Sequence, residues 1–147
     1  MKYAFCASIL TIILACINPV NAHAGVERVN IYMGHFLLQS WPGDKRPITM
    51  EVDTTLPPDT LVFQAIAVQG GLKNTTLQIR DLQGTVIDEV NRVTRLEDET
   101  EATFIYVLNS SNITKIKSRK FCVVLTSHLA HDADEHNIAL ILLDNSH

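Results

Sequence analysis

The feature that most constrains the fold of this chain is a series of short apolar or alternating segments, evenly spaced over residues 26–143. Residues 48–53 alternate between apolar and polar side chains, which is typical of a strand with one buried face. Residues 61–68 and 138–143 are almost wholly apolar, which predicts central strands. Frequent charges predict an edge strand at 85–90. The predicted strands are 26–32, 35–39, 48–53, 61–68, 75–80, 85–90, 103–108, 121–126 and 138–143.

About eight strands without a convincing amphipathic helix predict an all-β fold, an antiparallel β-sandwich of jelly-roll or immunoglobulin-like type. Asp81-Leu-Gln-Gly84 reads as a turn, so residues 75–90 are predicted to form a β-hairpin. The acidic stretch 91–101 is interpreted as a solvated loop rather than a calcium site, because it lacks the spacing of a calcium-binding loop. We expect one sandwich domain over residues 23–147.

The first 22 residues have the three-part pattern of a secretory signal peptide. Lys2 is followed by an apolar run at 4–15 and by a stretch that ends in a small residue, Ala22. The chain is therefore expected to be secreted or periplasmic, with no transmembrane segment after cleavage. An alternative is lipidation: Ile13-Leu-Ala-Cys16 resembles a bacterial lipobox, which would make the protein a lipid-anchored accessory subunit attached through Cys16.

The distribution of charge excludes one class of partner. The formal net charge is -4, and lysine and arginine are scattered, so the sequence lacks the basic field of a nucleic-acid-binding protein. The densest basic cluster is interpreted as a solvated strand edge, with an anion-binding patch as the alternative. This cluster comprises Lys115, Lys117, Arg119 and Lys120.

Cleavage would leave Cys122 as the one cysteine of the mature chain, which rules out an internal disulfide. Because Cys122 lies within an apolar strand, we predict a buried thiol that behaves as a small hydrophobic residue. A homodimer linked through Cys122 is the alternative for an odd cysteine in an exported protein.

Residues 127–137, SHLAHDADEHN, are the stretch richest in possible metal ligands. His128, His131 and His136 are candidate Zn²⁺ ligands, with neighbouring carboxylates to complete the shell, and His128 and His131 would share a face on one helical turn. The favoured interpretation is a polar loop between strands 121–126 and 138–143, because the spacing matches no established zinc signature. We expect no resident cofactor, and at most a weak zinc site.

Two other features bear on partners and modification. Trp41, the sole tryptophan, is a candidate partner contact, or alternatively packs over an open end of the sandwich. Asn74, Asn109 and Asn112 begin N-glycosylation sequons in predicted turns, and would carry glycan if the source is eukaryotic. The chain shows no nucleophile elbow, phosphate-binding loop or dinucleotide fingerprint, so we expect no enzymatic activity.

The segment from the apolar strand through Gly70-Gly71 and Leu77-Gln-Ile-Arg-Asp-Leu-Gln-Gly84 to Val86-Ile87 resembles a hairpin of two domain families. These are the GOLD-type domains and the bacterial prepeptidase C-terminal domains, both jelly-roll sandwiches. The cysteine pair common in GOLD domains of cargo receptors is absent from the mature chain. The resemblance therefore implies a sandwich fold and a binding role without naming a cargo. The resulting hypothesis is an exported, non-enzymatic interaction domain for a protein or glycan partner, with a secreted metal-binding protein as the alternative.

Overall fold

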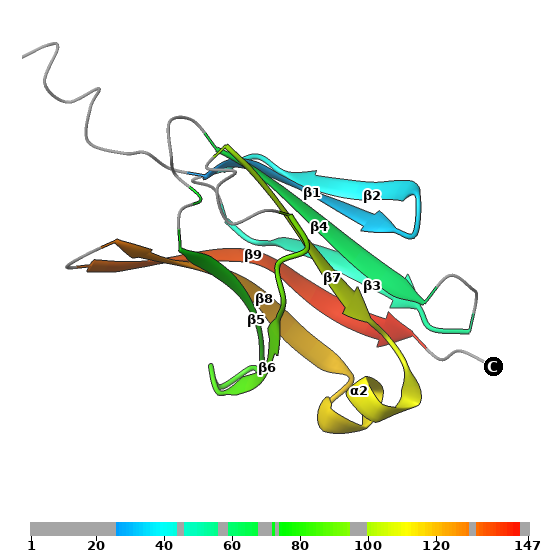
Figure 1. The fold of residues 1–147 in the computed structure, drawn as a ribbon. Helices are drawn as coiled ribbons and strands as arrows, with labels where there is room; N and C mark the ends of the chain where they lie inside the picture. The colour runs from blue at the N-terminus through cyan, green and yellow to red at the C-terminus, as the bar shows by residue number, and fades with distance from the viewer. Residues whose placement is uncertain are drawn as a thin grey trace, which may run out of the picture.

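Within the residues that it describes, the computed structural model contains nine strands and one short helix, and the strands form two sheets that face each other (Figure 1). The predicted all-β sandwich is confirmed. At 128–129 and 132–133 the structure describes the backbone alone. The residues that it describes are 26–43, 46–55, 59–67, 72, 74–94, 100–129 and 132–144.

The four-stranded sheet, here called sheet A, has the strand order β2-β1-β4-β7 and is antiparallel throughout. A tight turn at Gly34, which has a positive φ of 58°, joins its first two strands. The strands are β1 (Val26–Met33), β2 (Phe36–Trp41), β4 (Thr60–Ala67) and β7 (Glu101–Val107).

The five-stranded sheet, here called sheet B, has the order β3-β9-β8-β5-β6. Its strands are β3 (Ile48–Asp53), β5 (Thr75–Arg80), β6 (Val86–Val90), β8 (Lys120–Leu129) and β9 (Asp132–Asp144). The helix α2 (Ser110–Lys115) lies between β7 and β8. The polar connection at 109–118 therefore contains one turn of helix that the sequence analysis did not predict.

The core lies between the two sheets and is built by period-two alternation. In β4 every second residue, from Leu61 to Ala67, is buried, while the residues between them are half-buried on the other face. The inward residues of β7 and β8, including Phe104 and Phe121, meet them from both sheets. An alternating strand faces the core with one side, so its pattern indicates which of its side chains are buried. β8 departs from this rule, because residues 123–127 are buried in succession.

The predicted positions of three strands within their sheets are confirmed. β4 lies between β1 and β7, and β9 lies between β3 and β8, so both apolar runs are central. β6, which carries Asp88 and Glu89, is an edge strand, as its charges predicted. One pairing departs from the antiparallel pattern: β3 runs parallel to β9, from Ile48 opposite Ala139 to Asp53 opposite Asp144.

The prediction of a loop at residues 127–137 is wrong. β8 continues to Leu129 and β9 begins at Asp132, and the two strands pair over this whole stretch up to Leu129 opposite Asp132. The polar side chains suggested a loop, but strand pairing is made by backbone hydrogen bonds and tolerates polar side chains. The histidine-rich stretch is therefore the outer part of a long hairpin, which extends beyond β5 in Figure 1.

The interpretation of the basic cluster as a strand edge is also wrong. Lys115 ends α2, Lys117 and Arg119 lie in the turn that follows, and Lys120 begins β8. Because β8 lies between β9 and β5, Lys120 is at the end of a central strand and not along an edge.

The predicted signal peptide at 1–22 and the candidate lipidation site Cys16 lie outside the described residues. Among the residues that are described, no helix has the length and apolar character needed to cross a membrane.

Candidate interaction surface on sheet A

An apolar row crosses the outer face of sheet A. Opposed residues of an antiparallel ladder share one face, and their side chains are neighbours. Leu37 of β2 is opposite Tyr32 of β1, Tyr32 is opposite Val62 of β4, and Val62 is opposite Ile105 of β7. We call these four residues the apolar row. Its two ends are the most exposed: Leu37 is 56% and Ile105 39% exposed.

A polar row lies beside the apolar row and is held by hydrogen bonds between its own side chains. The Ser40 hydroxyl donates to Asn30 Oδ1 over 2.7 Å, and Asn30 Nδ2 donates to Gln64 Oε1 over 3.2 Å. Gln64 Oε1 also accepts from the Tyr32 hydroxyl, and Gln64 Nε2 donates to Glu101 Oε1 over 2.8 Å. Gln64 is thus bonded on both ends of its amide, which fixes the polar row in one arrangement.

β2 carries further exposed apolar residues: Phe36, Leu37 and Leu38 are consecutive and exposed to 73%, 56% and 43%. Phe36 is opposite Met33, which packs against the core, so Phe36 lies on the other face of the strand from Leu37. The register shifts between Ile31 and Tyr32 because β2 has one extra residue at this point, and Leu38 has no partner in the β1 register. Contiguous exposed apolar side chains rimmed by polar ones mark interaction surfaces. The outer face of sheet A and the adjoining β2 therefore form the candidate site.

Sequence reasoning missed these residues, although one signal was present. Phe36-Leu37-Leu38 are three consecutive apolar residues in a short predicted strand, and a strand with one buried face cannot bury three in succession. The members of the apolar row come from strands far apart in the sequence, so only the register brings them together.

Two of the candidate metal residues, His128 and His136, are not directly opposite each other in the hairpin register. His128 is opposite Ala133 in the register, three residues from His136, which corresponds to about 10 Å along a strand. The shared helical face proposed for His128 and His131 does not exist, because His128 belongs to β8; His131 lies outside the described residues. The described residues contain no group of three or more metal-ligating side chains.

Glu135, a candidate carboxylate ligand in the same stretch, forms an ion pair with Arg80 instead. Both guanidinium Nη atoms donate to the two carboxylate oxygens, and this pairing lowers the pKa of Glu135 and raises the pKa of Arg80. Arg80 belongs to β5 and Glu135 to β9, so the ion pair bridges across β8, which lies between them. Its role is to tie three strands of sheet B together.

Trp41 is 1% exposed, so the interpretation of this residue as a surface contact for a partner is wrong. It ends β2, and its ring lies 6.0 Å from the His136 ring, centroid to centroid, at a tilt of 57°. His136 is opposite the buried Leu125 and so lies on the inward face of β9. The pair links β2 of sheet A to β9 of sheet B, so Trp41 packs inside the molecule rather than on its surface.

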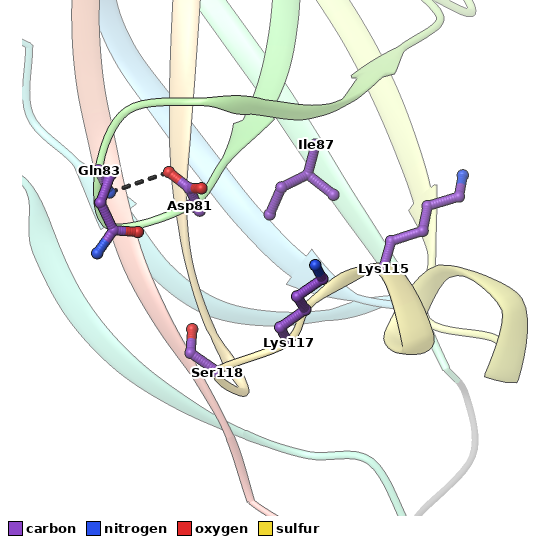
Figure 2. A pocket seen from close by; sticks show the side chains of 6 residues that line it. All are labelled: Asp81, Gln83, Ile87, Lys115, Lys117 and Ser118. Atoms are coloured by element: carbon purple, nitrogen blue, oxygen red, sulfur yellow. Dashed lines mark hydrogen bonds between the residues drawn. The ribbon is translucent and has the colours of Figure 1, made fainter.

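A pocket of about 390 Å³ lies between the β5–β6 turn and the connection from α2 to β8, as Figure 2 shows. Two of its charged side chains, Lys115 and Asp81, are engaged in the fold. Lys115 Nζ lies 2.9 Å from Asp88 Oδ2, and Asp81 Oδ1 accepts from the backbone N–H groups of Gln83 and Thr85. These contacts brace the turn and the helix, and the anion-binding alternative stays a prediction. The pocket is lined by Asp81, Gln83, Ile87, Lys115, Lys117 and Ser118.

Cys122 is a free thiol on the outer face of sheet B and is partly exposed. Burial is the main cause that raises its pKa, and the charge of Asp81 adds to it. A raised pKa leaves little thiolate near neutral pH, so the thiol is a poor nucleophile. The disulfide-linked homodimer stays a prediction.

The three sequon asparagines have different surroundings. Asn74 is exposed in the turn before β5 with a positive φ of 55°. Asn109 caps α2 through Oδ1, which accepts from the Asn112 N–H over 2.8 Å, so its Nδ2 is not used by the cap. Asn112 lies within α2, not in a turn, and its Nδ2 donates to the Val107 carbonyl over 2.7 Å. Glycan attachment at Nδ2 is therefore more compatible with Asn74 and Asn109.

Comparison with protein-family models, with curated proteins and with solved structures found no match to this chain. No enzyme family is identified by these comparisons, and they leave the resemblance to GOLD-type and prepeptidase C-terminal domains untested.

Proposed function

We propose that this chain is an exported, non-enzymatic β-sandwich that binds a protein partner through the outer face of sheet A. The observation that carries the proposal is the apolar row, which joins all four strands of that sheet and is exposed at both ends. The export part rests on the signal-peptide pattern of residues 1–22.

A protein partner fits this surface better than a glycan. Glycan recognition needs side-chain donors and acceptors that are free to bind hydroxyl groups. Here the amides of Asn30 and Gln64 bind each other, and Gln64 also binds Tyr32 and Glu101. A partner with an apolar centre would cover the apolar row and leave these bonds intact, as in protein interfaces with an apolar core and a polar rim.

Site-specific crosslinking tests the proposal. A photoreactive amino acid is placed at position 105, on the exposed end of the apolar row, and at position 82 as the control. Leu82 is 48% exposed, comparable to Ile105, but lies in the β5–β6 turn of sheet B. In cells that export the chain, we expect one defined protein to be crosslinked from position 105 and not from position 82.

Ile105→Lys should weaken capture of that same protein by about tenfold or more, since a charge at a position that the partner covers removes apolar packing there. Leu82→Lys should leave capture unchanged. Equal crosslinking from both positions, or equal capture by both variants, would refute binding through sheet A. Selective binding of the wild-type chain to a glycan array would move the proposal to a glycan partner.

A further inference from the structure

Sheet A and sheet B together have four edge strands, and three of them carry acidic side chains. β3 contains Glu51 and Asp53, β6 contains Asp88 and Glu89, and β7 contains Glu101. β7 is further covered by the segment after β6, through a bridge between Arg92 and Phe104. Charged or covered edges are the usual protection against pairing with another strand.

β2 is the exception. Its sequence, FLLQSW, contains no charge, and its residues 36–40 are all exposed. In the described part of the chain β2 has a single neighbour, β1, so the backbone groups along its other side face outward. An uncharged apolar edge with open backbone groups is a template for strand addition.

The charges of this chain favour a second copy as the strand that pairs there. The chain carries a net charge of -4, so two copies repel each other in general. Pairing β3, β6 or β7 with itself would also place acidic side chains near one another, and like charges on opposed strands are destabilising. β2 against β2 brings no charge into opposition, and it places Phe36, Leu37 and Leu38 of one copy beside those of the other.

We propose that two copies of this chain associate through β2, antiparallel about a two-fold axis, and extend sheet A from four strands to eight. The interface is one six-residue strand from each copy with its apolar side chains. The surface area that such an interface buries is smaller than the roughly 800 Å² per partner of a stable complex. We therefore expect a weak dimer with a dissociation constant of roughly 1–100 µM. The outer faces of sheet A in the two copies then lie on the same side of the dimer, which doubles the proposed partner surface. The dimer itself does not depend on whether a partner binds there.

The test uses the chain purified after expression of its full-length gene, with its intact mass recorded and a reductant present throughout. Sedimentation velocity from about 1 to 500 µM should show the weight-average mass rising from one chain to two. Leu38→Lys should weaken this dimer at least tenfold, because it opposes two positive charges across the axis. Leu82→Lys, an equally exposed leucine changed on sheet B, should leave it unchanged.

A mixture of two variants guards against the trivial explanation that a charged variant misfolds. Leu38→Lys and Leu38→Glu should each be largely monomeric, and their equimolar mixture should recover dimer as a heterodimer. Amide hydrogen exchange at residues 36–40 should slow with increasing wild-type concentration.

Three results would overturn the inference: a monomer at every concentration, a dimer that Leu38→Lys leaves intact, or a dimer that forms only when reductant is omitted and so depends on Cys122. None of these three results affects the crosslinking test at position 105. Likewise, a failure of the crosslinking test would not contradict the dimer through β2.

Discussion

At the scale of single residues, the side chains that looked most reactive in the sequence have structural roles. Glu135 binds Arg80 across β8, and Asp81 caps the β5–β6 turn by accepting two backbone N–H groups. His136 packs against Trp41. Each role depends on a partner at least two residues away or on another strand, so residue type alone did not reveal it.

The ion pair between Arg80 and Glu135 should contribute to stability in a pH-dependent way. Because the folded-state pKa of Glu135 is lowered, its contribution is present above the unfolded-state pKa and is lost as the pH falls through the folded-state value. The Glu135 side chain is 48% exposed, so the contribution is discounted for solvent screening to about 0.2–1 kcal/mol. Chemical unfolding of the wild type, Arg80→Ala, Glu135→Gln and the double variant, at pH 7 and at about pH 3, measures this coupling.

At pH 7 the double-variant cycle should give a favourable coupling, and the coupling should be smaller at about pH 3, because protonation of Glu135 removes its charge. Glu51→Gln, a change at an exposed glutamate on β3, serves as the control and should show no coupling with Arg80→Ala. A coupling that is independent of pH would show that the carboxylate charge is not responsible.

Trp41 is predicted to be one of the costliest positions to truncate. Its side chain is buried and contacts His136 of the other sheet, so Trp41→Ala should lower the free energy of unfolding by about 3–5 kcal/mol. Leu82→Ala, at an exposed position, should cost less than about 0.5 kcal/mol. Denaturation followed by far-ultraviolet circular dichroism compares the two, and similar losses would contradict the burial of Trp41.

At the scale of elements, strand existence was predictable and strand ends were not always so. Residues 48–53 and 75–80 were predicted with the bounds that the structure has, because their alternation ends at turn residues. β9 was predicted six residues too short at its start, since residues 132–137 show no apolar alternation. Those residues are held as a strand by the backbone of β8, which continues opposite them. A strand that is stabilised by its neighbour leaves little signal in its own sequence.

The helix α2 was missed for a related reason. With six residues it is too short to show a helical apolar period, and none of its residues is buried. Its N-cap, Asn109, was noticed only as the start of a sequon. We predict that Asn109→Ala will destabilise the fold by about 0.5–2 kcal/mol, because it removes the acceptor for the Asn112 N–H.

Asn109→Asp is the matched control, since it keeps the acceptor and also removes the sequon. It should retain the wild-type midpoint of thermal unfolding while Asn109→Ala lowers it. Both variants should lose any glycan at this position, which mass spectrometry verifies. A difference in stability between them therefore reports on the cap and not on the glycan. Equal destabilisation by both would show that the cap is not the cause.

At the scale of the whole molecule, the two sheets are completed by contacts between distant parts of the chain. β3 and β9 pair in parallel although about 90 residues separate them, and β9 also joins β3 to β8. Deleting residues 139–147 removes more than a third of β9 and the only described partner strand of β3. We expect this variant to lose cooperative unfolding, with weak dispersion in its amide NMR spectrum.

The control is deletion of residues 1–22, the predicted signal peptide. It should leave the sandwich and its unfolding transition unchanged, because every described strand begins after them.

If the variant that lacks residues 139–147 still unfolds cooperatively, the C-terminal part of β9 is not needed to hold sheet B together.

The sequence by itself determined that this chain forms strands, that the apolar strands at 61–68 and 138–143 are central, that 85–90 is an edge, and which face of the alternating strands is buried. These properties follow from the period-two pattern and from charge, both of which are local. Only the tertiary structure decided which strands are neighbours, that β3 runs parallel to β9, and that Leu37, Tyr32, Val62 and Ile105 form one row. Pairing and register depend on contacts between segments far apart in the sequence, so the candidate interaction surface exists only in the folded molecule.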